Sequence, residues 1–141
     1  MPTIYLETSI VSYLTARPSR DVVTLARQEV TREWWNTRRA NFQLFTSEFV
    51  IEEAEEGDPE AAKRRLDALK EAEELELPGE ARPLARKLVE EGPLPTNAAL
   101  DALHIAVSAT CGMDYLLTWN MKHIANAAIR DQTEQICRSS G

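Results

Sequence analysis

The sequence predicts an α/β fold, in which a three-layer α/β/α sandwich surrounds a mainly parallel sheet of four to five strands. Short β-rich segments alternate along the 141 residues with longer segments of helical periodicity, and this alternation is typical of parallel strands joined by helices. One short segment, residues 115–118, is apolar on both alternations, as expected of a strand buried on both faces. The length suits one folding unit, so we expect a single domain over residues 1–141.

The first third of the chain is expected to contain a central strand and two helices. Residues 3–6 are β-rich, and Thr8–Ser9 offers an N-cap for the helix that follows. Pro18 ends that helix. A long helix then begins near residue 21, because apolar side chains recur close to the helical period of 3.6 at Val22, Val23, Ala26, Val30 and Trp34.

The middle of the chain continues the alternation. Residues 41–46 alternate apolar with polar side chains and predict the second strand, after which Ser47 caps a helix that stops at Gly57. Asp58 is an N-cap, and Pro59 occupies the first position of the next helix. The remaining elements expected here are the rest of that helix to about residue 70, a strand over 75–77 and a helix over 80–91.

The last third is expected to hold two helices around one strand. Residues 97–110 are rich in alanine, so a helix there can pack closely on a sheet. The strand over 115–118 follows, and a final helix runs roughly from 125 to 138.

The charge balance is acidic, with a formal net charge of −7 and a pI near 4.9. This balance argues against an extended nucleic-acid-binding surface, because such surfaces are usually basic. A nuclease built around a metal ion needs only local positive charge, since the ion itself can hold the phosphate. The arginines that could supply this charge are Arg17, Arg20, Arg27, Arg32, Arg38 and Arg39.

The sequence shows no feature of export or membrane insertion. No apolar run approaches the ~20 residues that span a bilayer, and the N-terminus lacks the pattern of a secretory signal. Cys111 and Cys137 have no metal-binding spacing, so we expect them to be reduced thiols. We therefore predict a cytoplasmic protein with no membrane association.

Polar side chains from distant segments are expected to meet at one edge of the sheet. Glu7 follows the first strand directly, and Asn120 follows the strand over 115–118. The helix over 97–110 runs antiparallel to that strand, which brings Asp101 to the same edge. Because ligands bind at the carboxyl ends of parallel strands, this convergence predicts a site there.

The helix after the second strand adds Glu52 or Glu53 to the same edge. Glu52 shares a helical stripe with Glu48 and Glu56, which is typical of a solvated acidic face. Glu53 lies between apolar neighbours on the inward side, where a carboxylate is costly unless it is paired or bound to a cation. We therefore favour Glu53 over Glu52.

Grouped carboxylates suggest a metal site. They repel one another, which raises their pKa values unless a cation is bound. Mg²⁺ or Mn²⁺ would remove this penalty, because hard oxygen ligands suit these ions. Such an ion can activate water and stabilise charge on a phosphodiester that is being cleaved. The candidate catalytic residues and metal ligands are Glu7, Glu53, Asp101 and Asn120.

Simpler roles are open for some of these residues and for two histidines nearby. Asp101 could merely favour the helix N-terminus electrostatically. Asn120 could be a turn residue. His104 and His123 could ligate or orient a ligand, although a hydrogen-bonded structural histidine is the more common case.

Three stretches together resemble the PIN domain, and most of all the VapC-type toxin nucleases of bacterial toxin–antitoxin pairs. They are YLETS at residues 5–9, DALHIA at 101–106 and LTWN at 117–120. Their order and spacing fit the family over nearly the whole chain. The resemblance implies a metal-dependent endoribonuclease with an RNA substrate, often a homodimer, that a protein antitoxin holds inactive.

The resemblance also implies roles for individual residues. The four acidic or amide positions of the family correspond to Glu7, Glu53, Asp101 and Asn120. The small hydroxyl residues that typically line the site correspond to Thr8, Ser9 and Thr118. Two further candidates for lining the site are His123 and, as the alternative to Glu53, Glu52.

One departure from the family pattern concerns the first acidic residue. The family usually has Asp there, and Glu7 moves the carboxylate outward by roughly one C–C bond. This change and the acidic charge motivate an alternative function, a catalytically degenerate PIN module that binds RNA or a partner protein without cleavage. A further alternative is a phosphohydrolase that acts on small molecules. The family also usually has a strand after its last helix, which this sequence does not supply before residue 141.

Overall fold

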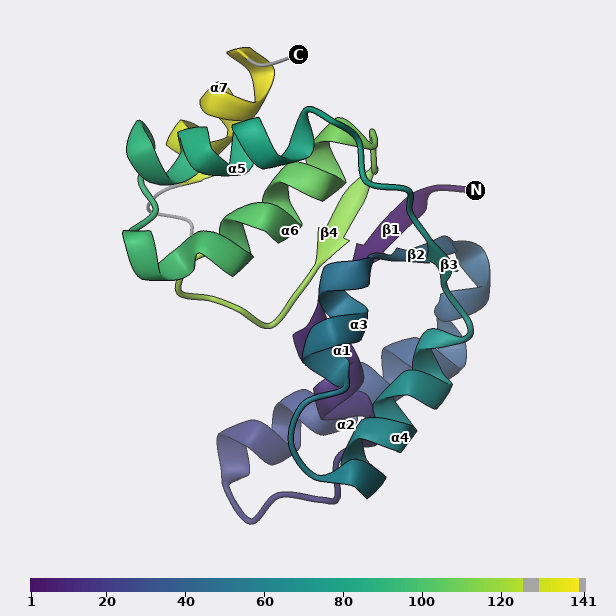
Figure 1. The fold of residues 1–141 in the computed structure, drawn as a ribbon. Coiled ribbons are helices and arrows are strands. Elements are labelled where there is room, and N and C mark those ends of the chain that lie inside the picture. Colours follow the sequence, from purple (N-terminus) through teal and green to yellow (C-terminus); the bar gives the residue numbers. More distant parts are fainter. Residues whose placement is uncertain (126–129, 140–141) are drawn as a thin grey trace.

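Four parallel strands form a central sheet with the order β3-β2-β1-β4 (Figure 1). The computed structural model describes residues 1–125 and 130–139. The strands are β1 (Thr3–Leu6), β2 (Gln43–Thr46), β3 (Glu73–Glu74) and β4 (Tyr115–Leu117). The predicted α/β class with a parallel sheet of four to five strands is therefore confirmed.

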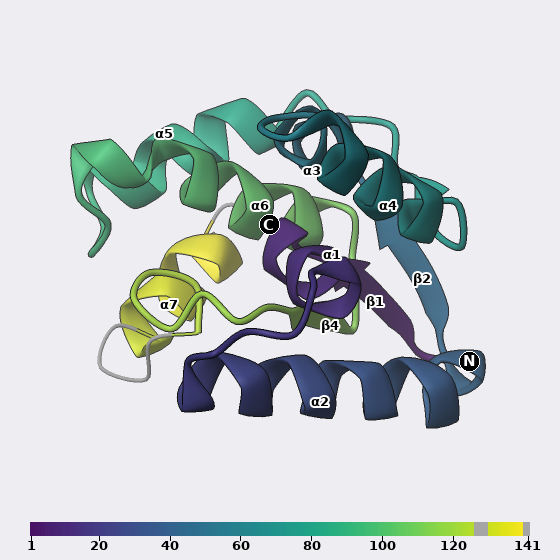
Figure 2. The same ribbon diagram turned by 90° about the horizontal axis from the view of Figure 1, so that it is seen from below.

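Helices connect the strands and cover both faces of the sheet. In chain order the described helices are α1 (Thr8–Thr15), α2 (Val22–Thr37), α3 (Glu48–Ala54), α4 (Pro59–Leu69), α5 (Ala81–Glu90), α6 (Ala99–Thr110) and α7 (Arg130–Ser139), with short 3₁₀ turns η1 (Arg39–Asn41) and η2 (Thr96–Ala98). Figure 2 shows α2 along one face of the sheet and α3, α4 and α6 on the opposite side. None of the described helices has the length and apolar character that a bilayer span requires.

The alternation of β1 divides the core into two apolar layers. Ile4 and Leu6 point to one face, where they pack with Trp35 of α2. Tyr5 points to the other face and packs into the larger layer, which α3, α5 and α6 complete. Helix α1 leaves the end of β1 and contributes Ile10 to the first layer and Val11 to the second. The two apolar layers therefore pack against both faces of the sheet at the carboxyl end of β1.

Helix α2 does not bury the apolar stripe that its periodicity predicted. Val22, Val23 and Val30 are 79%, 60% and 55% exposed, and the buried side chains of α2 are Gln28, Thr31 and Trp35. The two buried polar side chains are hydrogen-bonded: the Gln28 amide contacts the backbone of Arg17 and Ser19, and Thr31 donates to the Arg27 carbonyl. Burial of polar groups is tolerated when they are paired in this way.

Strand β4 is not buried on both faces as predicted. It lies at the edge of the sheet, where β1 is its one neighbour among the described strands, and Tyr115 is 56% exposed. An apolar run is therefore not sufficient evidence for a central strand. The third strand was also placed too late in the chain. It pairs with β2 over Glu73–Glu74, and the amide of Leu75 continues the ladder by donating to Thr46.

Several helix and strand boundaries also differ from the predictions. Helix α1 is capped by Glu7 rather than by Thr8–Ser9, because the Glu7 carboxylate accepts from the backbone N–H of Ser9 at 3.2 Å. Helix α3 ends at Ala54, and the chain turns at Gly57 with a φ of +83°. The predicted start of the last helix, near residue 125, runs into residues 126–129, which lie outside the described part of the chain. Helix α6 is preceded by η2, and β2 by η1.

Gly92→Ala is expected to destabilise the protein by about 1–3 kcal/mol, because the added methyl group would overpack the contact between α5 and α7. A Cβ at this position would lie 2.7 Å from the Leu88 carbonyl oxygen and 2.5 Å from the Ile136 side chain. Gly79→Ala is the matched control, since a Cβ there meets no atom within 4 Å. Urea unfolding of both variants measures the difference, and equal stabilities would contradict the described packing.

Candidate functional site

Three carboxylates from three distant segments lie at the carboxyl edge of the sheet. Glu7 directly follows β1 and is 6% exposed. Glu53 lies on α3, which follows β2, and Asp101 lies in the first turn of α6; their side chains are 26% and 23% exposed. Glu52, the alternative to Glu53, is exposed and makes none of the site's hydrogen bonds.

Hydroxyl groups from both ends of the chain hold the Glu7 carboxylate. Its Oε1 accepts hydrogen bonds from the hydroxyls of Ser9 and Thr118, each at 2.5 Å. Its Oε2 accepts from the backbone of Ser9. The Ser9 hydroxyl in turn accepts from the backbone N–H of Trp119 at 2.8 Å. The parallel pairing of β1 with β4 brings these residues together, and the Glu7 amide extends that pairing by donating to Leu117.

Glu53 is held by a hydroxyl and an imidazole. Its Oε1 accepts from the Thr8 hydroxyl at 2.7 Å and from Nε2 of His104 at 2.5 Å. Burial by itself would raise the pKa of Glu53. The hydrogen bonds from His104 and Thr8, together with the electrostatic attraction between Glu53 and the His104 ring, outweigh burial and lower the pKa. For Glu53 this is the reverse of the rise expected for grouped carboxylates. Glu53 is therefore ionised at neutral pH.

Asp101 is linked to the same edge through His123 and Asn120. Its Oδ2 lies 2.8 Å from Nδ1 of His123. The backbone N–H of His123 donates to the side-chain oxygen of Asn120, and the backbone N–H of Asn120 donates to the Thr118 hydroxyl. A continuous series of hydrogen bonds thus runs from Asp101 to Glu7, because Thr118 also donates to Glu7.

The structure thus connects all but one of the predicted candidates. Eight of them lie within these hydrogen-bond networks: Glu7, Thr8, Ser9, Glu53, Asp101, Thr118, Asn120 and His123. Glu52 is the exception. Two residues that were not predicted for the site, Tyr5 and Ser47, extend the hydrogen-bond network of Glu53 through His104. His104 itself is buried and hydrogen-bonded, which is the more common role of such a histidine. The signal for His104 was an ionisable side chain one turn after Asp101 in an otherwise apolar helix.

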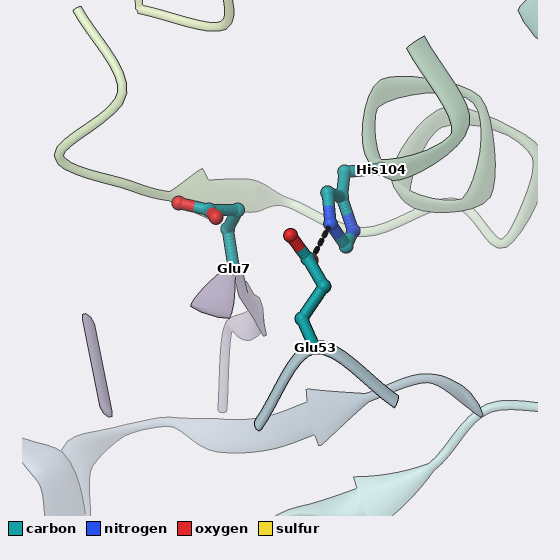
Figure 3. Close-up of side chains that lie close together, drawn as sticks. All are labelled: Glu7, Glu53 and His104. Carbon is teal, nitrogen blue, oxygen red and sulfur yellow. Dashed lines mark hydrogen bonds and ion pairs between the residues drawn. The ribbon is translucent and has the colours of Figure 1, made fainter. Parts of the chain in front are cut away.

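The donor atoms suit a divalent cation. Ligand atoms of Glu7, Glu53 and His104 lie within 4.8 Å of one another, and Figure 3 shows these three side chains grouped at the sheet edge. Oε2 of Glu53 accepts no hydrogen bond from the described residues, and no described arginine forms an ion pair with these carboxylates. Asp101 does not belong to this closest group, because it is directed to His123. Carboxylate oxygens grouped in this way fit a divalent metal ion.

Positive charge close to this edge is provided by Arg27. Its guanidinium lies 5.4 Å from the ring centroid of Trp119, the residue between Thr118 and Asn120. Of the other candidate arginines, Arg32 has a structural role, since it donates to the carbonyls of Leu14 and Ala16 at the end of α1.

No protein-family model matches the sequence, and no curated protein matches it. A solved structure does match: VapC20 of Mycobacterium tuberculosis, a toxin that cleaves the sarcin–ricin loop, superposes with a TM-score of 0.64. The match covers 89% of this chain and 95% of that chain, at 16% sequence identity.

The chain has a VapC-like PIN fold. The structural match confirms the fold that the three sequence stretches predicted. At 16% identity the similarity concerns the fold alone, so the activity has to be argued from the site. In the PIN fold of this chain, the carboxylate site lies at the carboxyl ends of β1 and β2, where ligands of parallel sheets bind.

Proposed function

We propose that this protein is a Mg²⁺- or Mn²⁺-dependent endoribonuclease and the toxin of a type II toxin–antitoxin pair. The observation that carries the proposal is the grouping of Glu7 and Glu53 at one sheet edge, where their ligand atoms lie within 4.8 Å of each other. Asp101 is linked to this group by hydrogen bonds through His123, Asn120 and Thr118. A site rich in carboxylates suits a hard cation and repels phosphate in its absence. The likeness to VapC20, which cleaves an RNA loop, supports RNA as the substrate.

Each residue has a chemical role in this proposal. Glu7 and Glu53 would hold the ion, with Asp101 and Asn120 completing the site on the other side. A divalent ion held there would supply the Lewis acidity that activates a water nucleophile and stabilises charge on the phosphodiester. Thr8, Ser9 and Thr118 donate hydrogen bonds to the carboxylates and so fix the direction of their oxygens. Preorganised oxygens would not have to reorient when the substrate binds.

The partners follow from the same proposal. A toxin of this class would work on RNA in the cytoplasm, would form a homodimer and would be held inactive by a protein antitoxin. Analytical ultracentrifugation of the purified protein measures directly whether the homodimer forms.

Cleavage of an RNA panel tests the proposed activity. The purified protein is incubated with structured and single-stranded RNAs, including a sarcin–ricin loop, in Mn²⁺ or Mg²⁺. EDTA and Asp101→Asn serve as controls. Cleavage that both controls abolish supports the proposal. Absence of both cleavage and Mn²⁺ binding would refute it.

A second function is favoured by one observation. The carboxylate oxygens of Glu7 and the Oε1 of Glu53 already accept hydrogen bonds from the protein, which partly satisfies them without a cation. A PIN module that binds RNA or a protein without cleavage is compatible with that. Such a module would bind RNA equally well in EDTA and in Mn²⁺, whereas the proposed nuclease would not.

Arg27→Ala is expected to weaken RNA binding about tenfold, because a charged hydrogen bond to phosphate would be lost. Its guanidinium is held over Trp119, beside Asn120, and donates no hydrogen bond to the described residues. The matched control is Arg39→Ala: Arg39 also lies over a tryptophan, 4.7 Å from the Trp35 centroid, but precedes β2 at the opposite sheet edge. Binding measured over a range of salt concentrations should lose about one unit of slope only for Arg27→Ala. An equal loss for both variants would contradict a contact at the site.

A further inference from the structure

A row of buried polar groups runs from the start of α3 to Glu53. The Ser47 hydroxyl lies 2.7 Å from the Tyr5 hydroxyl, which lies 2.7 Å from Nδ1 of His104. Nε2 of His104 lies within hydrogen-bond distance of Oε1 of Glu53, at 2.5 Å. Tyr5 and His104 are 0% exposed and Ser47 is 2% exposed. Buried polar groups of this kind are costly unless every donor finds an acceptor.

We propose that Ser47, Tyr5 and His104 form a directed hydrogen-bond relay that positions the Glu53 carboxylate for a divalent cation. The inference rests on the proposed metal-dependent function. It assigns His104 as a positioning residue that acts through Glu53, and not as a metal ligand.

The direction of the relay follows from Glu53. An ionised carboxylate only accepts hydrogen bonds, so Nε2 of His104 must carry a proton. In the neutral ring Nδ1 is then an acceptor, and the Tyr5 hydroxyl donates to it. Tyr5 in turn accepts from the Ser47 hydroxyl, and Ser47 accepts from the backbone N–H of Val50 at 3.4 Å. Every donor in the row has an acceptor.

The reverse direction leaves a buried group unpaired. If Nδ1 carried a proton as well, it would donate to Tyr5, and Tyr5 would donate to Ser47. The Ser47 hydroxyl would then have no acceptor among its described partners, Tyr5 and Val50. An unpaired buried donor costs about 1–3 kcal/mol, which favours the arrangement in which Nε2 of His104 donates and Nδ1 accepts.

The environment of Tyr5 keeps it a donor. Burial raises the pKa of Tyr5 above its ordinary value, although the hydrogen bond with Ser47 acts the other way, and the negative charges of Glu53 and Glu7 add to the rise. The Tyr5 hydroxyl is therefore available as a donor to Nδ1 of His104.

The relay determines which oxygen of Glu53 is available to bind a cation. His104 and Thr8 both donate to Oε1, which occupies that oxygen and fixes the plane of the carboxylate. The other oxygen is directed toward the Glu7 side chain, as Figure 3 shows. A cation between Glu7 and Glu53 would therefore meet one prepared oxygen of Glu53. Removal of a donor that orients a metal ligand in this way typically lowers metal affinity by about 10–100-fold.

Tyr5→Phe tests the relay, because it removes one hydroxyl and keeps the shape of the ring. We expect Mn²⁺ affinity, measured by isothermal titration calorimetry, to fall about tenfold. Thr110→Val is the control: Thr110 lies at the far end of α6 and also loses one hydroxyl hydrogen bond, to the Ala106 carbonyl. It should keep the Mn²⁺ affinity of the wild-type protein, because the relay and Glu53 are unchanged. A merely structural Tyr5 would leave both affinities unchanged.

The ring nitrogens of His104 give a second, independent readout. Their ¹⁵N chemical shifts in the wild-type protein should show a protonated Nε2 and an unprotonated Nδ1. Tyr5→Phe should shift the Nδ1 signal, because its donor is gone. If the wild-type protein binds Mn²⁺ and the Tyr5→Phe variant binds it with the same affinity, the relay is overturned. Wild-type protein that binds no Mn²⁺ would refute the proposed function instead, and a protonated Nδ1 would overturn the relay in either case.

Discussion

Glu53→Gln is expected to lower kcat for RNA cleavage by about 10²–10³-fold, the size typical of losing one preorganised electrostatic contact. His104 and Thr8 both donate to one side-chain oxygen of Glu53. In the variant they would retain the amide carbonyl and turn the NH₂ group toward the cation. A donor would then replace an anionic ligand at the point where charge is needed.

Glu52→Gln on the same helix is the matched control. It makes the same chemical change one residue away, but Glu52 is exposed and lies outside the hydrogen-bond networks of the site. Its kcat should stay within about twofold of wild type, in line with surface substitutions generally. Single-turnover cleavage of the same RNA by both variants separates them, and similar rates for the two would refute the assignment of Glu53.

Glu7→Asp is expected to lower kcat by about 10–100-fold, because a shift of roughly 1 Å at a reacting centre has effects of this size. The Glu7 carboxylate accepts a hydrogen bond from the Thr118 hydroxyl at 2.5 Å. Aspartate would withdraw the carboxylate from Thr118 and from the cation. It would still cap α1 through the Ser9 amide, since aspartate is a favoured N-cap residue.

The stability of Glu7→Asp therefore separates two explanations. A melting temperature within a few degrees of wild type together with lost activity would show that glutamate is the ligand length this site requires. A sharp gain of activity would instead support partial degeneration of a site that works better with aspartate. Rates and thermal melts of the same preparation distinguish these cases.

The convergence of the site was predictable because it depends on topology. A carboxylate directly after β1, one on α3 and one at the start of α6 must lie at the same sheet edge once the strands are parallel. The choice of Glu53 over Glu52 was also within reach of the sequence, since one residue changes the direction of a helical side chain by about 100°. The structure places Glu53 inward and Glu52 outward.

What the sequence could not supply is the pairing of the polar side chains. Tyr5 read as an apolar strand residue, and its hydroxyl partners, Ser47 and His104, come from two other elements. The buried face of α2 was missed for a similar reason. Gln28 and Thr31 are buried because particular backbone and side-chain partners lie opposite them, and hydrophobic periodicity contains no information about such partners.

The hydrogen bond between Glu7 and Thr118 has a consequence for the timing of synthesis. Its two residues are 111 positions apart, so Glu7 leaves the ribosome long before Thr118, its hydrogen-bond partner. At ~5–20 residues per second, the delay is on the order of ten seconds. During this interval the nascent chain lacks β4 and has no assembled site. A ribonuclease built in this order would be inert while still attached to the ribosome that makes it, and assaying ribosome-bound chains arrested before Tyr115 would reveal whether it is.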